Sequence, residues 1–335
     1  MRFALDGEQT AFAATLDRLL TAAGTPAVVR AWAAGEPGPG RELWGRLAGT
    51  GVFALAVPTG YGGLGPLPVE VVCACVELGR HAVPGPVAEA VAVAALLGRL
   101  GERAAAGAWL PRIADGRLVP TLAAPGGGPY ALDADAADVV FAVDEDGTRL
   151  RVAAGHGAVQ PSLDPARRLA RPAAGGEVVA RGEAVRRAAA HALDWARLAV
   201  AAQALGAGRA LLDRTVAQVR RRTQFGRPVG SFQAVKHRLA DVLLALEFAG
   251  PVVYDAAVAL AGAAPDAGAR VAVAKAQAGE AAYAAGRAAL QLHGAIGYTA
   301  EFDLSLWLGK ARALRSAWGG VAQCRARALE LTSMR

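Results

Sequence analysis

Apolar residues recur at helical spacing through the first third of the chain. Four stretches carry this pattern, and loops containing Gly and Pro separate them, as expected of helices that pack on one another. The predicted helices are Glu8–Ala23, Arg41–Gly49, Pro68–Arg80 and Pro86–Leu100. We therefore predict an α-helical N-terminal domain over residues 1–115.

The pattern changes between residues 116 and 182. Short runs rich in β-branched residues alternate there with turn signals such as Asp144-Glu-Asp-Gly147, which is typical of small antiparallel sheets. The predicted strands are Val139–Val143, Arg149–Ala153 and Glu177–Ala180. The segment predicts a reduced middle domain, built as a small antiparallel barrel or sandwich.

From residue 183 to residue 335 the pattern is helical again. Trp195–Arg221 contains no proline and predicts one long helix, and a later helix is predicted from about Ala269 to Gln291. Between them, apolar residues recur on one helical face. The members of this face are Phe232, Val235, Leu239, Val242, Leu243 and Leu246.

A turn with unusual chemistry, Arg222-Thr-Gln-Phe-Gly-Arg-Pro-Val-Gly-Ser-Phe-Gln233, joins two of these helices. Gly226, Pro228 and Gly230 break the first helix, and Ser231 is expected to cap the second. The turn presents a guanidinium, an amide and an aromatic ring, a combination suited to a phosphorylated molecule with a ring. On these residues alone, a plain helix–helix turn with a solvated basic end remains open.

A second turn, Gln291-Leu-His-Gly-Ala-Ile-Gly-Tyr-Thr299, ends the later helix. Gly294 stands where a helix C-cap favours a left-handed residue. Gly297 lets the backbone approach a flat or charged ligand, because it carries no Cβ. An ordinary helix–loop–helix turn is the alternative here.

Composition narrows the class of protein. The chain has 335 residues, 54% of them hydrophobic and 19% charged, which excludes a disordered chain and leaves room for two or three domains. The formal net charge is +7, but the arginines are scattered and aromatics are only 6%, so we expect no nucleic-acid partner. Ligands that carry phosphate groups would suit a positive surface.

Three cysteines and five histidines show no ligand spacing, so we predict neither a metal site nor a disulfide framework. The nearest approach to a membrane span is Val87–Leu100, whose length suits a buried helix, so no span is predicted. The N-terminus lacks the layout of a signal peptide. We infer a cytoplasmic protein.

The two turns resemble the cofactor segments of acyl-CoA dehydrogenases. The first, together with Gln233 and Leu239-Ala-Asp241, is similar to the segment that grips FAD across the dimer interface of that family. The second is similar to the family's Gln-x-x-Gly-Gly-x-Gly-Tyr segment, with Ala295 in place of the second glycine. The Tyr61-Gly-Gly63 loop and Pro161-Ser-Leu-Asp-Pro165 also match, so the resemblance covers nearly the whole chain.

The resemblance implies the family's architecture, which is mostly α with a small β domain. It comprises an α-helical N-domain, a middle antiparallel β-barrel at 116–182 and a C-terminal four-helix bundle at 183–335. It also implies FAD as the cofactor, an acyl-CoA or other acyl thioester as the substrate, and residues that contact the FAD of a neighbouring subunit. Those residues are Arg222, Gln224, Phe225, Gln233, Gln291, Gly294 and Gly297.

Two departures from the family concern the chain's own flavin and substrate. The family's Thr-Glu-Pro-x-x-Gly-Ser stretch is here the glycine-rich Thr121–Pro129, and no Trp-Ile-Thr follows. Alpha-proton removal needs a carboxylate, yet the commonest glutamate position aligns with Trp318 and the alternative position with Ala196. The nearest substitute carboxylates in the sequence are Glu301 and Asp303.

Three functions therefore stay open. The first is a subunit of an FAD-dependent acyl-CoA dehydrogenase that lacks the usual glutamate and completes a partner's site. The second is a self-sufficient dehydrogenase with a substitute base. The third is a non-redox protein, an acyl-thioester binder or a lyase, on the same fold. We expect an oligomer, either a homo-oligomer or a hetero-oligomer with a paralogous acyl-CoA dehydrogenase.

Overall fold

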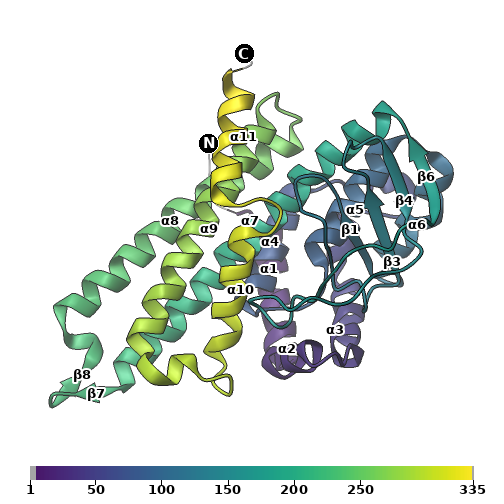
Figure 1. The fold of residues 1–335 in the computed structure, drawn as a ribbon. Helices are drawn as coiled ribbons and strands as arrows, with labels where there is room; N and C mark the ends of the chain where they lie inside the picture. The colour runs from purple at the N-terminus through teal and green to yellow at the C-terminus, as the bar shows by residue number, and fades with distance from the viewer. Residues whose placement is uncertain (1–4, 334–335) are drawn as a thin grey trace.

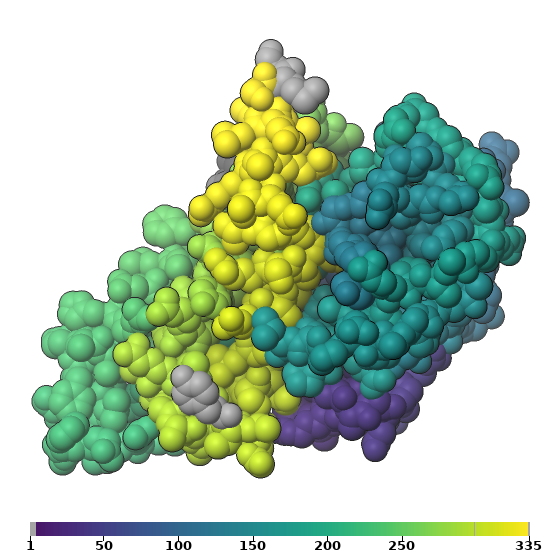
Figure 2. All heavy atoms as spheres, viewed as in Figure 1, coloured from purple at the N-terminus to yellow at the C-terminus, as the bar shows by residue number. Residues whose placement is uncertain are grey.

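Helices occupy both ends of the chain, and strands lie between them. The computed structural model describes residues 5–333, apart from the side chain of Tyr298. Figure 1 shows the N-terminal helices and the sheet on one side of the molecule and the long C-terminal helices on the other. Figure 2 shows the same division on the surface, where the C-terminal helices meet the middle segment along one face.

The four predicted N-terminal helices are found, and the structure adds two that were not predicted, Thr25–Ala33 and Arg103–Ala114. Pro68–Arg80 is found unchanged, and the other three shift by one to three residues at their ends. A capping box fixes the start of the first helix, because the Asp6 carboxylate accepts from the Gln9 amide at 2.8 Å and the Gln9 side chain accepts from the Asp6 amide at 3.1 Å. The helices are α1 (Gly7–Ala22), α2 (Thr25–Ala33), α3 (Gly38–Ala48), α4 (Pro68–Arg80), α5 (Val87–Leu100) and α6 (Arg103–Ala114).

The strands of the middle segment form two sheets. They are β1 (Pro120–Ala123), β2 (Ala131–Leu132), β3 (Val139–Val143), β4 (Arg149–Val152), β5 (Leu169–Ala170) and β6 (Glu177–Arg181). The larger sheet has the order β1-β3-β4-β6, and β2 pairs with β5. The predicted strand positions are correct to within one residue.

The expectation that this segment is antiparallel throughout is wrong for one pair. β3–β4, β4–β6 and β2–β5 are antiparallel, but β1 and β3 run parallel. The chain leaves β1, passes through the glycine-rich loop and β2 in the other sheet, and returns to start β3 at the same end as β1. Strand patterning in a sequence does not report this crossover, because it depends on the path of the connection.

The C-terminal helices are longer than the sequence indicates. α7 (Glu183–Arg221) spans 39 residues and starts well before Trp195. It runs from the sheet to the far tip of the bundle and packs against α4, α5 and α9 (Figure 1). The remaining helices are α8 (Gln233–Ala261), α9 (Ala267–His293), α10 (Leu304–Ser316) and α11 (Val321–Ser333).

The turn between α7 and α8 is a small hairpin, which the sequence did not predict. β7 (Thr223–Gln224) pairs with β8 (Arg227–Pro228), and Phe225 and Gly226 form its tip with positive φ values of 55° and 75°. Ser231 is not the helix cap. Phe232 takes that position without a side-chain hydrogen bond, and the Ser231 hydroxyl is buried with no partner among the described residues.

One helix, α8, is long and apolar enough to cross a membrane by length and composition, and 44% of its apolar window is buried. The sequence predicted this helix but gave Val87–Leu100, not this helix, as the nearest approach to a membrane span. Its buried face, which includes Val242 and Leu246, packs on the bundle helices α7 and α9. Leu243 was expected on that face but is 47% exposed, beside Leu244 and Phe248, which are also exposed. The apolar surface of α8 is therefore wider than the contacts within one chain use.

Two glycines set the closest approach between α4 and α7. A Cβ at Gly206 would overlap the carbonyl oxygen of Val76, and a Cβ at Gly79 would overlap that of Gln203. The two helices therefore touch backbone to backbone, which only glycine permits at these two positions. This contact joins the N-terminal helices to the bundle.

We expect Gly206→Ala to lower the free energy of unfolding by about 1–3 kcal/mol, because the added methyl group must push α4 and α7 apart. The matched control is Gly107→Ala in α6, where a Cβ meets nothing within 4 Å. That substitution should be neutral or stabilising by up to about 1 kcal/mol. Chemical denaturation measures both changes, and an unchanged stability of Gly206→Ala would contradict the close contact.

Candidate functional site

The two turns singled out in the sequence lie side by side at one end of the bundle. Arg222 Nη1 donates to the carbonyl oxygen of His293 at 2.9 Å, so the end of α7 is tied to the end of α9. Burial lowers the pKa of His293, and the nearby Arg222 charge acts in the same direction. The imidazole is therefore neutral near pH 7, and Arg222 supplies the positive charge here.

Most of the predicted cofactor-contacting residues are on the surface. Arg222, Gln224, Gln233 and Gln291 are exposed, and Gly294 is half-buried. The Phe225 side chain is 91% exposed at the tip of the hairpin. Within the chain, these groups have surface free to meet a molecule bound elsewhere.

The glycines of the second turn behave differently from one another. Gly294 has a positive φ of 69° as predicted, but its ψ of −144° lies outside the left-handed helical region. Such a conformation is essentially restricted to glycine, which explains why this position is a glycine. The predicted left-handed helix cap is not found. Gly297 is buried and lies against His293 and Leu290.

The second group of sequence positions lies elsewhere, around Trp318. This residue follows α10 with a positive φ of 56°, a conformation that costs a non-glycine residue about 1–3 kcal/mol. Its side chain is only 5% exposed. The indole Nε1 donates to Glu89 Oε1 on α5 at 2.9 Å. The indole therefore points into the molecule, where the sequence alignment would place the family's glutamate.

The glycine-rich loop packs directly on this indole. A Cβ at Gly127 would come within 2.6 Å of the Trp318 ring, and a Cβ at Gly126 within 2.8 Å of Leu193 on α7. The hydroxyl of Thr121, at the start of the stretch, donates to the Leu132 carbonyl at 2.6 Å and is fully buried. The structure thus brings the altered loop next to both Trp318 and the α7 segment that holds Ala196.

Buried cations hold the loop that carries Trp318. Arg197, the neighbour of Ala196 on α7, donates through Nε to the Trp318 carbonyl at 3.0 Å. Lys275 on α9 donates to the carbonyls of Arg315 and Gly319, each at 3.2 Å. The positive φ of Trp318 is sustained by these contacts, because they fix the carbonyls on both sides of the residue.

A cavity of about 210 Å³ remains beside the indole. Ligand pockets for drug-sized molecules measure roughly 300–1,000 Å³, so this space is too small for a flavin ring with its ribityl chain. The residues that line it are Glu89, Gly127, Tyr130, Leu132, Ser162, Leu163, Arg167, Leu169, Ala313, Ser316, Ala317 and Trp318.

The carboxylates suggested as substitute bases lie away from this cavity. Asp303 forms an ion pair with Arg30 at 2.7 Å, and the Arg30 guanidinium also bonds the Glu301 carbonyl at 3.1 Å. The Glu301 side chain is exposed. The carboxylate beside Trp318 is Glu89, which the sequence analysis missed. Its signal was a charged residue within the apolar run Val87–Leu97, at a position now seen to be 3% exposed.

One group of possible metal ligands occurs within the described residues, although the sequence predicted none. The ligand atoms of Asp17, Glu77 and His81 lie within 4.8 Å of one another. Arg80 lies 3.2 Å from Glu77 and 3.9 Å from Asp17, and His81 lies 2.8 Å from Asp17. These contacts already neutralise the carboxylates, so we assign the group to helix packing between α1 and α4.

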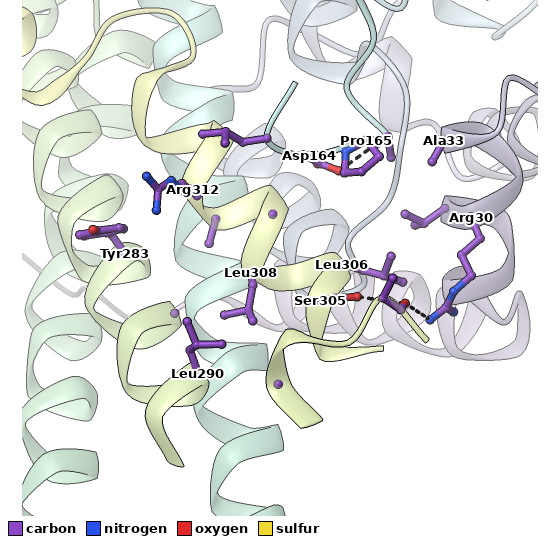
Figure 3. A pocket seen from close by; sticks show the side chains of 18 of the residues that line it. Arg30, Ala33, Asp164, Pro165, Tyr283, Leu290, Ser305, Leu306, Leu308 and Arg312 are labelled. Carbon is purple, nitrogen blue, oxygen red and sulfur yellow. Dashed lines mark hydrogen bonds between the residues drawn. The ribbon is translucent and has the colours of Figure 1, made fainter. Parts of the chain in front are cut away.

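A larger cleft, of about 640 Å³, opens between α9, α10, α2 and the segment 163–166. Figure 3 shows Leu306, Leu308 and Leu290 along its wall, with Tyr283 and Arg312 on one side and Arg30 on the other. Its lining is mainly apolar. Gly297 of the second turn and Leu290, which directly precedes that turn, both line the cleft, so the cleft is continuous with the predicted cofactor surface.

Known proteins share both the fold and the sequence pattern. The family model for the acyl-CoA dehydrogenase N-terminal domain matches residues 6–117, and the model for the C-terminal domain matches residues 186–329. Acyl-CoA dehydrogenase IpdE2 of Mycobacterium tuberculosis is 34% identical over 289 residues, which cover 85% of each chain. The chain therefore belongs to the acyl-CoA dehydrogenase family.

Solved structures agree with this assignment. The Tcur3481–Tcur3483 steroid ACAD G363A variant is 25% identical with a TM-score of 0.83, over 98% of both chains. The ChsE4–ChsE5 complex from Mycobacterium tuberculosis is 24% identical with a TM-score of 0.86 over the full length of both chains, which shows a shared fold. Family members are flavin-dependent oxidoreductases of lipid metabolism.

The family implies FAD, and the two regions of this chain fit it unequally. The surface around Arg222 and Gly294 fits, because it offers an exposed guanidinium beside backbone that no Cβ blocks. The cavity beside Trp318 does not fit, because the indole narrows it to about 210 Å³ and the Thr121 hydroxyl already donates to the Leu132 carbonyl.

The Lys275 contacts give a testable pH dependence. Burial lowers the pKa of Lys275 to about 8 from an ordinary value of 10.5. Between these two pH values the unfolded chain holds a proton that the folded chain has released, so the free energy of unfolding rises with pH, by up to about 1.4 kcal/mol per pH unit.

We expect Lys275→Met to remove this rise, whereas Lys236→Met, on the exposed surface of α8, should keep it. Denaturant titrations at pH values across the window measure the slope for each protein. Equal slopes for wild type and Lys275→Met would show that the folded-state pKa is not lowered.

Proposed function

We propose that this chain is the subunit of a heteromeric, FAD-dependent acyl-CoA dehydrogenase that completes its partner's flavin site. The partner, a paralogous acyl-CoA dehydrogenase, would hold the flavin ring and supply the catalytic carboxylate. This chain would contribute Arg222, Gln224, Phe225, Gln233, Gln291, Gly294 and Gly297. The resemblance of the two turns to the family's interface segments assigns these roles.

The observation that carries the proposal is the separation of two regions. The side chains that would meet a neighbour's FAD keep the family pattern and lie exposed at the tip of the bundle, whereas Gly294 is half-buried and Gly297 is buried. Positions that would serve the chain's own flavin and substrate have changed, and they pack together in the interior around Trp318. A division of labour between subunits explains this sorting, whereas scattered loss of function would not.

The chemistry requires what this chain lacks. FAD, when bound, accepts the hydride from the β-carbon of the acyl thioester. A carboxylate must remove the α-proton, and the indole of Trp318 and the methyl group of Ala196 cannot accept one. What this chain can do is bind: Arg222 can form charge-assisted hydrogen bonds to a pyrophosphate, and Phe225 can cover an apolar ring face.

The cleft in Figure 3 supports a partner on the same face. It joins the second turn, and its apolar wall continues to Leu163, which is 64% exposed. Contiguous apolar surface of this kind marks interaction sites. We propose that the partner covers this face and that the complex acts in the cytoplasm on acyl-CoA or another acyl thioester.

The first test compares the lone chain with a co-expressed complex. The partner is a paralogue from the same genome with its glutamate intact. The chain alone should fail to reduce flavin with saturating acyl-CoA, at a rate about 10²–10⁴-fold below the complex, because the proton acceptor is missing. Flavin absorbance reports the reaction, with fatty and steroid acyl-CoA substrates tested in parallel.

The same preparation gives the flavin content. One FAD per two chains is expected in the complex, because only one of the two flavin positions is complete. Full flavin bleaching by the lone chain would defeat the proposal and would favour a self-sufficient enzyme. The absence of flavin from both preparations would favour a non-redox thioester-binding protein.

The second test concerns Arg222. In the complex, Arg222→Ala should weaken FAD binding by about 1.5–3 kcal/mol, the usual value for a lost charge-assisted hydrogen bond. Arg181→Ala, an exposed arginine on β6, is the control for overall charge. Flavin release measured by fluorescence gives both affinities, and an equal affinity of Arg222→Ala and wild type would remove this residue from the site.

A further inference from the structure

A buried arginine without a partner lines the cavity beside Trp318. Arg167 is 9% exposed, and among the described residues its guanidinium has neither a hydrogen bond nor an ion pair. Its neighbours on the same segment differ. Arg168 is paired with Asp135, and Arg171 is exposed and stacks over the Tyr130 ring at 5.1 Å.

The charged side chains around Arg167 do not form a hydrogen bond or an ion pair with its guanidinium. Asp133 is fully buried, and burial raises its pKa to about 7, with Arg167 acting in the opposite direction through space. Asp164 Oδ1 accepts from the Ala166 amide at 3.0 Å. Glu89 uses Oε1 for the Trp318 indole, and its Oε2 is closed off from solvent. Lys310, also buried, donates to the Val83 carbonyl at 2.7 Å.

An arginine keeps its charge inside a protein. A largely buried charge without a protein partner is unfavourable, so water or a bound anion in the cavity must supply the hydrogen bonds of the guanidinium. The planar guanidinium fork fits the two oxygens of a carboxylate. Hydroxyl groups of Tyr130 and Ser162 lie on the same wall and can add further hydrogen bonds.

Size and polarity restrict the rest of the ligand. The space of about 210 Å³ corresponds to roughly seven water volumes. The rest of the wall combines the polar side chains of Glu89 and Ser316 with apolar groups, which include Leu132, Leu169 and the Trp318 ring. The suitable molecule is therefore a small carboxylate with a short apolar tail.

We propose that the cavity between Arg167 and the Trp318 indole is a binding site for a short-chain carboxylate. The site is built by the substitutions that close the flavin position, so it would be a new function of that space. It does not depend on the proposed role of the chain in a partner's flavin site, and it can be tested on the full chain alone.

Butanoate is the probe, measured by calorimetric titration and by the shift in melting temperature at constant ionic strength. Butanamide is the uncharged analogue, and sodium chloride and inorganic phosphate test for a simple anion effect. We expect butanoate to raise the melting temperature by about 2–4 °C near saturation, with no effect from the other three. An equal effect of butanamide, chloride or phosphate would overturn the carboxylate assignment.

Arg167→Gln should lower the affinity for butanoate by about 10–100-fold. Without ligand, this variant should melt at the same temperature as wild type or higher, because an unpaired buried charge has been removed. A structural role for Arg167 predicts the reverse, a lower melting temperature and no butanoate effect in wild type. Arg171→Gln, four residues after Arg167 on the same segment, is the matched control and should bind as wild type does.

A competition experiment separates this site from a residual flavin position. FAD added to the butanoate-bound chain should leave butanoate in place, because the cavity does not admit the flavin ring. Displacement of butanoate by FAD would show that the space still belongs to the cofactor and would overturn the proposal.

Discussion

The backbone contact between α4 and α7 determines where both functional regions lie. α7 extends from the sheet to the tip of the bundle, so it carries Ala196 and Arg197 near its middle and Arg222 at its end. Gly79 and Gly206 let the N-terminal helices touch this single helix at the main chain. Because α7 is one continuous helix packed on α4, α5 and α9, its length sets the separation between the interior around Trp318 and the exposed hairpin.

Buried charged side chains stabilise the interior region around Trp318, because each would be energetically unfavourable without a hydrogen-bond partner. Arg197 and Lys275 bond the carbonyls of the loop that carries Trp318, and the indole bonds Glu89. The outcome is a closed, specific arrangement in place of an open catalytic pocket. The positive φ of Trp318 is a strained backbone conformation, which persists only where the surrounding contacts hold it. It is therefore typical of a loop with one fixed conformation.

The exposed region has the opposite character. Phe225 projects from a two-stranded hairpin, and its ring contacts Phe232 only edge-on, at 6.2 Å between ring centroids. Apolar side chains on the outer surface of α8 and the cleft beside α10 leave further surface without a cover in one chain. The exposed aromatic tip and guanidinium, together with this uncovered apolar surface, support the proposed role of the chain at an interface with another subunit.

The sequence by itself determined four of the N-terminal helices, the helical character of the C-terminal part, the strands β3, β4 and β6, the two turns and the family. These features depend on local periodicity, on glycine and proline at turns, and on short motifs, all of which can be read along the chain. The parallel pairing of β1 with β3, the β7–β8 hairpin and the true start of α7 needed the tertiary structure, because each depends on which segments meet in space.

The same reason separates the residues of the two regions. Arg222 and Gln291 could be predicted from motifs, whereas Glu89, Arg167 and Lys275 carry no motif and gain their roles only from burial next to Trp318. The sequence also indicated Glu301 and Asp303 by proximity along the chain, but Arg30 from α2 bonds the Asp303 side chain and the backbone carbonyl of Glu301. The sequence gives the type and charge of each residue, but only the folded structure determines which residues form pairs, because paired residues can be far apart in the chain.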